Sequence, residues 1–251
     1  MTTYVAFFRA LNVGGHGVVS MLALRRMHEA LGLQAVNTYI QTGNVLFTSD
    51  EGDALSLACQ IEGRCLQEFG FASRVVLRRA VDLEEVITTN PFPSEAEQAP
   101  ERLVVLFLAA PPVPAAASVL QRLAAAGPEK LQLSARGQEL YIWYADGIGR
   151  SKLTPAELER ALGCPATGRN WRTLLQIRRL LQQRQKGERR SLEKGIIRGS
   201  GANSSPAPLV GSKRVRAKQS CGTGRGSSLL AGVAVAGLTP CPGGSAGYSG
   251  D

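Results

Sequence analysis

The sequence contains few of the residues from which catalytic and metal sites are usually built. It has two histidines, His16 and His28, and five cysteines that form no CxxC pair. No Ser-His-Asp or Cys-His arrangement with a supporting motif is visible, which argues against nucleophilic catalysis. No group of His, Cys, Asp and Glu has the spacing of metal ligands either. We therefore expect no metal and no cofactor.

Aromatic residues and long apolar runs are also scarce. Phe, Trp and Tyr make up 6% of the chain, which is little for a sheet that stacks RNA bases. The apolar run at 229–238 is far shorter than the roughly 20 residues of a membrane-spanning helix. The first residues read as a strand rather than an export signal, and the cysteines form no secreted disulfide framework. We expect a cytoplasmic protein without a membrane partner.

The net charge of +9 is concentrated near the C-terminus. Residues 1–185 contain 19 Lys and Arg against 17 Asp and Glu, whereas residues 186–251 contain 10 against 3. The last 66 residues also hold 14 of the 28 glycines and show no periodic apolar pattern. Such a segment buries too little surface to offset its chain entropy, so we predict a disordered tail over 187–251. The tail is either functional or an accidental extension, and its charge supports a nucleic-acid partner only weakly.

The first part of the chain has the apolar periodicity of a ferredoxin-like α+β subdomain over residues 1–79. The pattern predicts strands at 3–8, 36–41, 45–48 and 72–79 and helices at 21–31 and 53–69. This order, βαββαβ, gives a sheet with two helices on one face.

Residues 80–186 are expected to form a second, related α+β subdomain with C-terminal helices. The pattern predicts helices at 81–88, before 126, at 154–162 and at 171–185, a strand at 103–108, and a hairpin of 131–135 and 140–144 turning at Gly137. Thr154, Pro155 and Glu157 form a capping box, which marks the start of one helix. Prolines at 91 and 93 are expected to prevent helix there.

Three basic, glycine-containing loop segments, 9–16, 146–152 and 167–171, are candidates for an anion site. Backbone N–H groups exposed beside glycine, with cationic side chains nearby, are typical of phosphate and carboxylate sites. The predicted ligand-binding residues are Arg9, Asn12, Gly14, Gly15, Arg150, Lys152, Arg169 and Asn170.

Each segment also has a structural interpretation that the sequence leaves open. The glycines at 14–15 could simply allow the positive φ angles of a strand-to-helix connection. The basic pair at 150 and 152 could form a solvated turn. Arg169 could close the last helix onto the sheet, with Trp171 as a core aromatic. Residues 42–44 are best interpreted as a hairpin turn.

Several motifs together resemble a known bacterial family, named for domain of unknown function 1697. The resemblance covers about residues 1–182, and the motifs are RALNVGGH (9–16), NTYIQTGNVLF (37–47), NPF (90–92), GIGRSKLT (147–154) and ATGRNWRTL (166–174). It implies an α+β fold. The family's biochemical role is not established, so the resemblance implies kinship without an activity.

Three classes of function fit these observations. The first is a cytoplasmic binding protein for an anionic, phosphate-bearing small molecule such as a nucleotide. The second is a single-stranded RNA-binding module, since ferredoxin-like sheets can present stacking aromatics. The third is an enzyme acting on a phosphorylated or carboxylated substrate, with Asp146 as base and Arg150 stabilising developing charge. The sequence does not define an oligomeric state.

Overall fold

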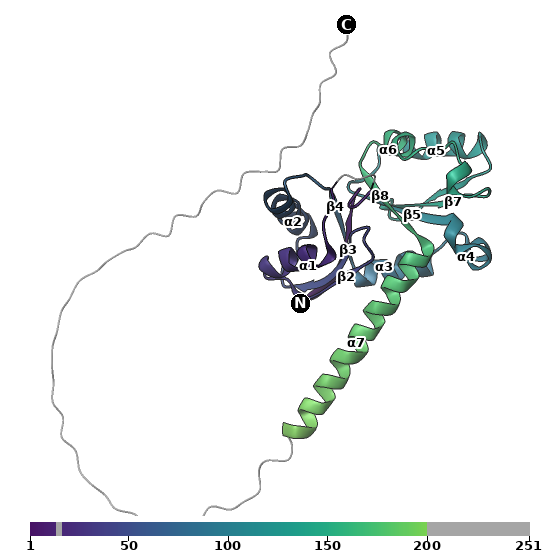
Figure 1. The fold of residues 1–251 in the computed structure, drawn as a ribbon. Helices are drawn as coiled ribbons and strands as arrows, with labels where there is room; N and C mark the ends of the chain where they lie inside the picture. The colour runs from purple at the N-terminus through teal and green to yellow at the C-terminus, as the bar shows by residue number, and fades with distance from the viewer. Residues whose placement is uncertain (14–16, 200–251) are drawn as a thin grey trace, which may run out of the picture. The chain divides into compact units, whose positions relative to one another are not determined.

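Two four-stranded antiparallel sheets form the framework of the chain, and each is covered on one face by two helices (Figure 1). A computed structural model describes residues 1–13 and 17–199. We call residues 2–79 the first repeat and residues 103–170 the second repeat, because both have the same order of elements.

The first repeat has the predicted ferredoxin-like order. Its elements are β1 (Thr2–Phe8), α1 (Met21–Ala30), β2 (Gln34–Tyr39), β3 (Asn44–Ser49), α2 (Ala54–Phe69) and β4 (Val75–Arg79). The strands pair in the order β2-β3-β1-β4. Ser20 and Asp53 begin the two helices, because each side chain accepts a backbone N–H group of the first turn.

The second repeat confirms the predicted related unit. Its elements are β5 (Leu103–Leu108), α5 (Ala116–Ala125), β6 (Lys130–Leu133), β7 (Glu139–Trp143), α6 (Pro155–Leu162) and β8 (Ala166–Asn170). The strand order is β6-β7-β5-β8, which matches that of the first sheet position by position. The predicted capping box of α6 is present, since Thr154 Oγ1 accepts from Glu157 N at 3.2 Å and Glu157 accepts from Thr154 N at 2.9 Å.

Three segments differ from the sequence prediction. Residues 166–170, expected to be a loop, form the edge strand β8, which lacks apolar alternation because a glycine and polar residues occupy it. A short helix, α4 (Pro93–Gln98), begins at the second of these prolines, since a proline in the first turn loses no helical hydrogen bond. The last helix, α7 (Trp171–Gly199), continues past 185, where Arg, Lys and Glu favour helix without an apolar stripe. Of the predicted disordered tail, residues 200–251 lie outside the described residues.

The two repeats share a hydrophobic core formed by the sheet faces opposite the paired helices. Phe7 of β1 stacks on Phe107 of β5 with ring centroids 4.3 Å apart. The connecting helix α3 (Ala80–Thr88) and the start of α7 complete this core, in which Trp171 is buried as a core aromatic. Two short 3-10 turns, η1 (Pro100–Arg102) and η2 (Ile148–Arg150), complete the described elements. Both repeats belong to one structural unit, Met1–Ser191.

The strand registers show which positions of the two repeats are equivalent. Phe8 pairs with Val75 at the end of the β1–β4 ladder, as Leu108 pairs with Ala166 in the β5–β8 ladder. Counting along both ladders makes position 78 equivalent to position 169. On the other side of the central strands, Phe7 pairs with residue 44 and Phe107 with residue 139. Positions 44 and 139 are therefore equivalent too.

Gly43 is expected to tolerate no side chain, because it lies in the β2–β3 turn at φ +75°. An added Cβ would lie 2.7 Å from Phe8 Cβ and 2.9 Å from Leu11 Cδ2. We predict that Gly43→Ala lowers the free energy of unfolding by about 2 kcal/mol, the sum of backbone strain and overpacking. Urea denaturation measures this loss. Gly32→Ala is the matched control, since Gly32 has φ +79° with no atom within 4 Å of the added Cβ. Equal losses in the two variants would contradict the packing contribution.

Candidate functional site

Two buried arginines join the repeats at equivalent positions. Arg78 of β4 donates from Nε to Glu139 Oε1 at 2.7 Å and from Nη2 to the backbone oxygens of Gln138 and Leu108 at 2.9 and 3.1 Å. Its guanidinium lies over the Phe107 ring, 5.7 Å from the centroid. The first repeat thus binds the second through an ion pair and backbone hydrogen bonds.

Arg169 of β8 makes the reciprocal contacts with the first repeat. Its Nε donates to Asn44 Oδ1 at 2.5 Å, and its Nη2 donates to the backbone oxygens of Phe8 and Gly43 at 2.8 and 3.2 Å. The guanidinium lies over the Phe7 ring at 5.3 Å. Through these hydrogen bonds Arg169 joins the second repeat to the first, rather than the last helix to the sheet.

The two arginines differ in charge compensation. Glu139 gives Arg78 a carboxylate partner, whereas the equivalent residue for Arg169 is the neutral Asn44. Every hydrogen-bond acceptor of Arg169 in the described part of the chain is neutral. Burial without a counter-charge lowers the pKa of Arg169 to about 10. At neutral pH the arginine remains charged, so uncompensated positive charge is buried at this position.

Arg169 lines a groove of about 480 Å³, and both repeats contribute to its wall. We call it the cross-repeat groove. Its lining consists of residue 8 at the end of β1, 9–11 and 13 of the following loop, 40 and 42 of the β2–β3 turn, 155 and 159 of α6, 166–170 of β8 and 173 of α7. A hollow of this size accommodates a small metabolite.

Backbone strain is concentrated beside this groove. Among the described residues other than glycine, four have positive φ, and three of them, Ala10 (56°), Asn12 (55°) and Ile40 (52°), lie in the two loops that form one wall. For a β-branched residue such as Ile40 this conformation is unusual and costs free energy. Strained backbone tends to occur at ligand sites, where the surrounding structure holds it. The equivalent loops of the second repeat contain positive φ only at glycine.

The structure brings three of the predicted ligand residues to the cross-repeat groove, namely Arg9, Arg169 and Asn170. Arg9 is half-exposed and forms an ion pair with Glu159. Asn170 donates from Nδ2 to Glu101 O at 2.7 Å and accepts from Arg172 N at 2.9 Å, so its amide fixes the start of α7.

The other predicted residues lie away from the groove lining or outside the described chain. Asn12 holds its own loop, since its Nδ2 donates to Gln41 O at 2.7 Å and its Oδ1 accepts from Val19 N at 2.7 Å. Arg150 and Lys152 are exposed and do not line the groove. Gly14 and Gly15 are outside the described residues.

Sequence reasoning did not find Asn44, Glu139 or Arg78 as partners in this arrangement. The strand that carries Arg78 reads VVLRR, while the one that carries Arg169 reads ATGRN. The two strands share only the arginine, so their equivalence becomes visible through strand register rather than through sequence similarity.

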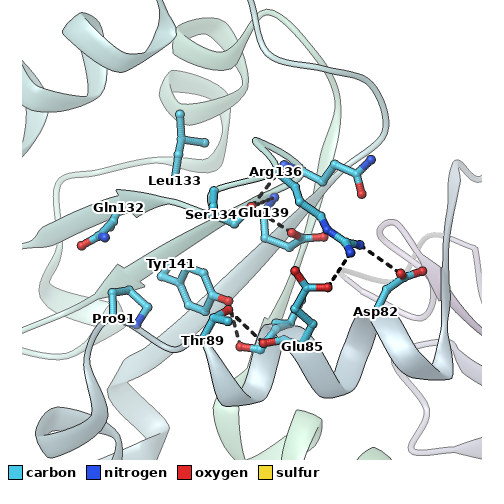
Figure 2. A pocket seen from close by; sticks show the side chains of 13 residues that line it. Asp82, Glu85, Thr89, Pro91, Gln132, Leu133, Ser134, Arg136, Glu139 and Tyr141 are labelled. Carbon is cyan, nitrogen blue, oxygen red and sulfur yellow. Dashed lines mark hydrogen bonds and ion pairs between the residues drawn. The ribbon is translucent and has the colours of Figure 1, made fainter.

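A smaller hollow of about 180 Å³ lies between α3 and the β6–β7 turn (Figure 2). Arg136 projects across it and pairs with Asp82 at 3.1 Å and with Glu85 at 2.6 Å. Its lining contains three carboxylates, Asp82, Glu85 and Glu139, against one arginine, so this hollow attracts an anion less than the cross-repeat groove does.

Neither a metal-binding group nor a membrane-spanning helix is found among the described residues. Among them, no three His, Cys, Asp or Glu side chains are grouped so that they could hold a metal ion. No helix within the described part combines the length and the apolar character needed to cross a bilayer.

Comparison with known proteins identifies the family. The model of the family described as "Protein of unknown function (DUF1697)" matches residues 1–141. Among solved structures, the chain is similar to a conserved bacterial protein from Streptococcus pneumoniae, with 24% identity, a TM-score of 0.54, and coverage of 72% of this chain and 98% of that one. That likeness supports the fold alone. The comparison with curated proteins gives no match. Since the family match spans more than half of its length, the chain belongs to the DUF1697 family of proteins of unknown function.

Proposed function

We propose that this protein binds a small anionic molecule, such as a nucleotide or another phosphate-bearing metabolite, in the cross-repeat groove. The observation that carries the proposal is the buried Arg169, which lines this groove and has only neutral hydrogen-bond partners in the described chain. We further propose that it acts in the cytoplasm, which agrees with the unpaired thiols of Cys65 and Cys164.

The charge of Arg169 can act on an anion at a distance. A unit charge about 10 Å from an anion contributes about 1.7 kcal/mol at an effective dielectric constant of about 20. The hydrogen bonds of Arg169 are directed at the protein, so the arginine attracts an anion through its field rather than by direct contact. We propose that Arg9, which is half-exposed on the groove wall, contacts the ligand.

The two alternative functions receive less support from the geometry. An RNA-binding module of the ferredoxin-like type needs an exposed sheet face, but both faces of β1 are buried, with Phe7 in the shared core and Tyr4 under the helices. For an enzyme, Asp146 lies exposed beside η2 and does not line the groove. Binding of a small anion is therefore the function that we favour.

Asn44→Asp tests the proposal by giving Arg169 the carboxylate that Arg78 already has. The new charge would lie beside Arg169 Nε, because Asn44 Oδ1 is 2.5 Å from that atom. We expect the affinity of the full-length protein for AMP, measured by isothermal titration calorimetry, to fall by roughly 10- to 20-fold, following the Coulomb estimate above. Adenosine, which lacks the phosphate, should bind weakly to both proteins.

Asn37→Asp is the matched control, since Asn37 is exposed on β2 and undergoes the same change in charge. It should leave the AMP affinity within about twofold of wild type, because an exposed charge is screened. The basic C-terminal residues are common to all these proteins, so any binding to them cancels in the comparison. Equal AMP affinity in wild type, Asn37→Asp and Asn44→Asp would remove Arg169 as the source of binding.

A further inference from the structure

The carboxylate of Glu159 lies on the wall of the cross-repeat groove in a setting typical of anion recognition. It accepts two hydrogen bonds from one guanidinium, Arg9 Nε at 3.0 Å and Arg9 Nη2 at 2.9 Å. Its Oε1 also accepts from the backbone N–H of Ala166 at 2.9 Å. A planar arginine fork with a backbone N–H beside it is an arrangement that binds carboxylates and phosphates.

The first repeat shows which of these contacts is structural. Glu62 of α2 accepts from the N–H of Val75 at 2.8 Å, and Val75 is equivalent to Ala166. Both repeats therefore use a glutamate to satisfy the first amide of the edge strand. The cationic partner differs, because Glu62 pairs with Arg74 of its own repeat at 3.2 Å, whereas Glu159 pairs with Arg9 across the groove.

The Arg9–Glu159 pair is weak enough for an external anion to replace it. The side chains are 46% and 22% exposed, respectively, and exposed ion pairs contribute little net stability because water and salt screen them. Glu159 would keep its hydrogen bond to Ala166 after losing Arg9. Arg9 can therefore change partners without leaving a buried group unsatisfied.

We infer that Glu159 occupies the place of the ligand's anionic group and competes with it for Arg9. This inference rests on the function proposed above and specifies the ligand further. The ligand carries a carboxylate or phosphate with two oxygens arranged for the guanidinium fork of Arg9, and Glu159 sets the threshold concentration at which it binds.

Glu159→Gln tests the competition in the full-length protein. The amide oxygen can still accept from Ala166 N–H, but the side chain no longer holds Arg9 by charge. We expect the variant to bind AMP or succinate about tenfold more tightly than wild type in calorimetric titrations at low salt. The two probes distinguish a phosphate from a carboxylate as the preferred anionic group.

Glu62→Gln is the matched control, because it makes the same change in charge on the equivalent helix and retains the equivalent hydrogen bond to Val75. It should bind both probes as wild type does. The double variant Arg9→Ala/Glu159→Gln should lose the tenfold gain, which would separate relief of competition for Arg9 from a general change in surface charge.

The outcomes distinguish a failure of the competition for Arg9 from a failure of the proposed anion-binding function. If wild type binds a probe and Glu159→Gln binds it no more tightly, the competition is overturned while the groove remains a binding site. A gain that also occurs in Glu62→Gln, or that persists without Arg9, likewise overturns it. If neither probe binds to wild type or to Glu159→Gln, the proposed anion-binding function fails, and the inference fails with it.

Discussion

Replacing Glu139 with alanine should lower the free energy of unfolding by about 3–5 kcal/mol, the range found when one partner of a buried ion pair is removed. Arg78 and Glu139 are both buried, and their charged atoms lie 2.7 Å apart. Alanine would leave the Arg78 guanidinium with backbone acceptors but without a negative charge. It would also remove the acceptor of Ser134 Oγ, which lies 3.0 Å from Glu139 Oε2. Urea denaturation followed by circular dichroism measures the loss.

Glu95→Ala provides the comparison for a surface ion pair. Glu95 pairs with Lys130 at 2.7 Å, but the lysine side chain is mostly exposed, so the expected loss is about 1 kcal/mol or less. If Glu139→Ala cost no more than Glu95→Ala, the Arg78–Glu139 pair would contribute little to the joining of the repeats.

His28 should make the folded protein sensitive to acid. It is fully buried on α1, its Nδ1 contacts Leu24 O at 2.8 Å, and the rings of Phe8 and Phe47 lie beside it. Burial lowers the pKa of His28 from 6.5 to about 4. Between these pH values the unfolded chain binds a proton that the folded chain does not. Stability is therefore complete above about pH 6.5 and falls towards pH 4, by about 3 kcal/mol in total.

A His28→Leu variant should lose this contribution, because leucine does not titrate and fits an apolar site. Urea denaturation of both proteins at a series of pH values between 4 and 7.5 gives the comparison. The difference in unfolding free energy, wild type minus variant, should become more negative as the pH falls. A difference that stays constant over this range would mean that His28 titrates equally in the folded and unfolded states.

Elements were predictable from sequence where a local interaction defines them. Helix α6 is capped by Thr154 and Gly163, because a capping box forms at one end and the glycine adopts φ +71° at the other. Gly137 likewise turns the β6–β7 hairpin with φ +66°. These signals act within a few residues, so they can be recognised from the sequence alone.

The candidate site was predictable only in part, because it depends on pairs of residues far apart in sequence. Arg9 and Arg169 were recognised as cations beside glycines, but nothing local indicates that Glu159 neutralises one while Asn44 leaves the other uncompensated. Strand β8 was missed because its residues form a strand through pairing with β5 rather than through their own propensity.

The reciprocal arginines also constrain the order in which the protein can be completed during synthesis. The acceptor that Arg78 needs, Glu139, lies 61 residues downstream, while Arg169 finds Asn44 125 residues upstream. When the first repeat has just emerged from the ribosome, the guanidinium of Arg78 stays hydrated until β7 has been synthesised. The second repeat is made after its partner, so the two repeats close in one direction, and the start of α7 is the last element added to the shared core.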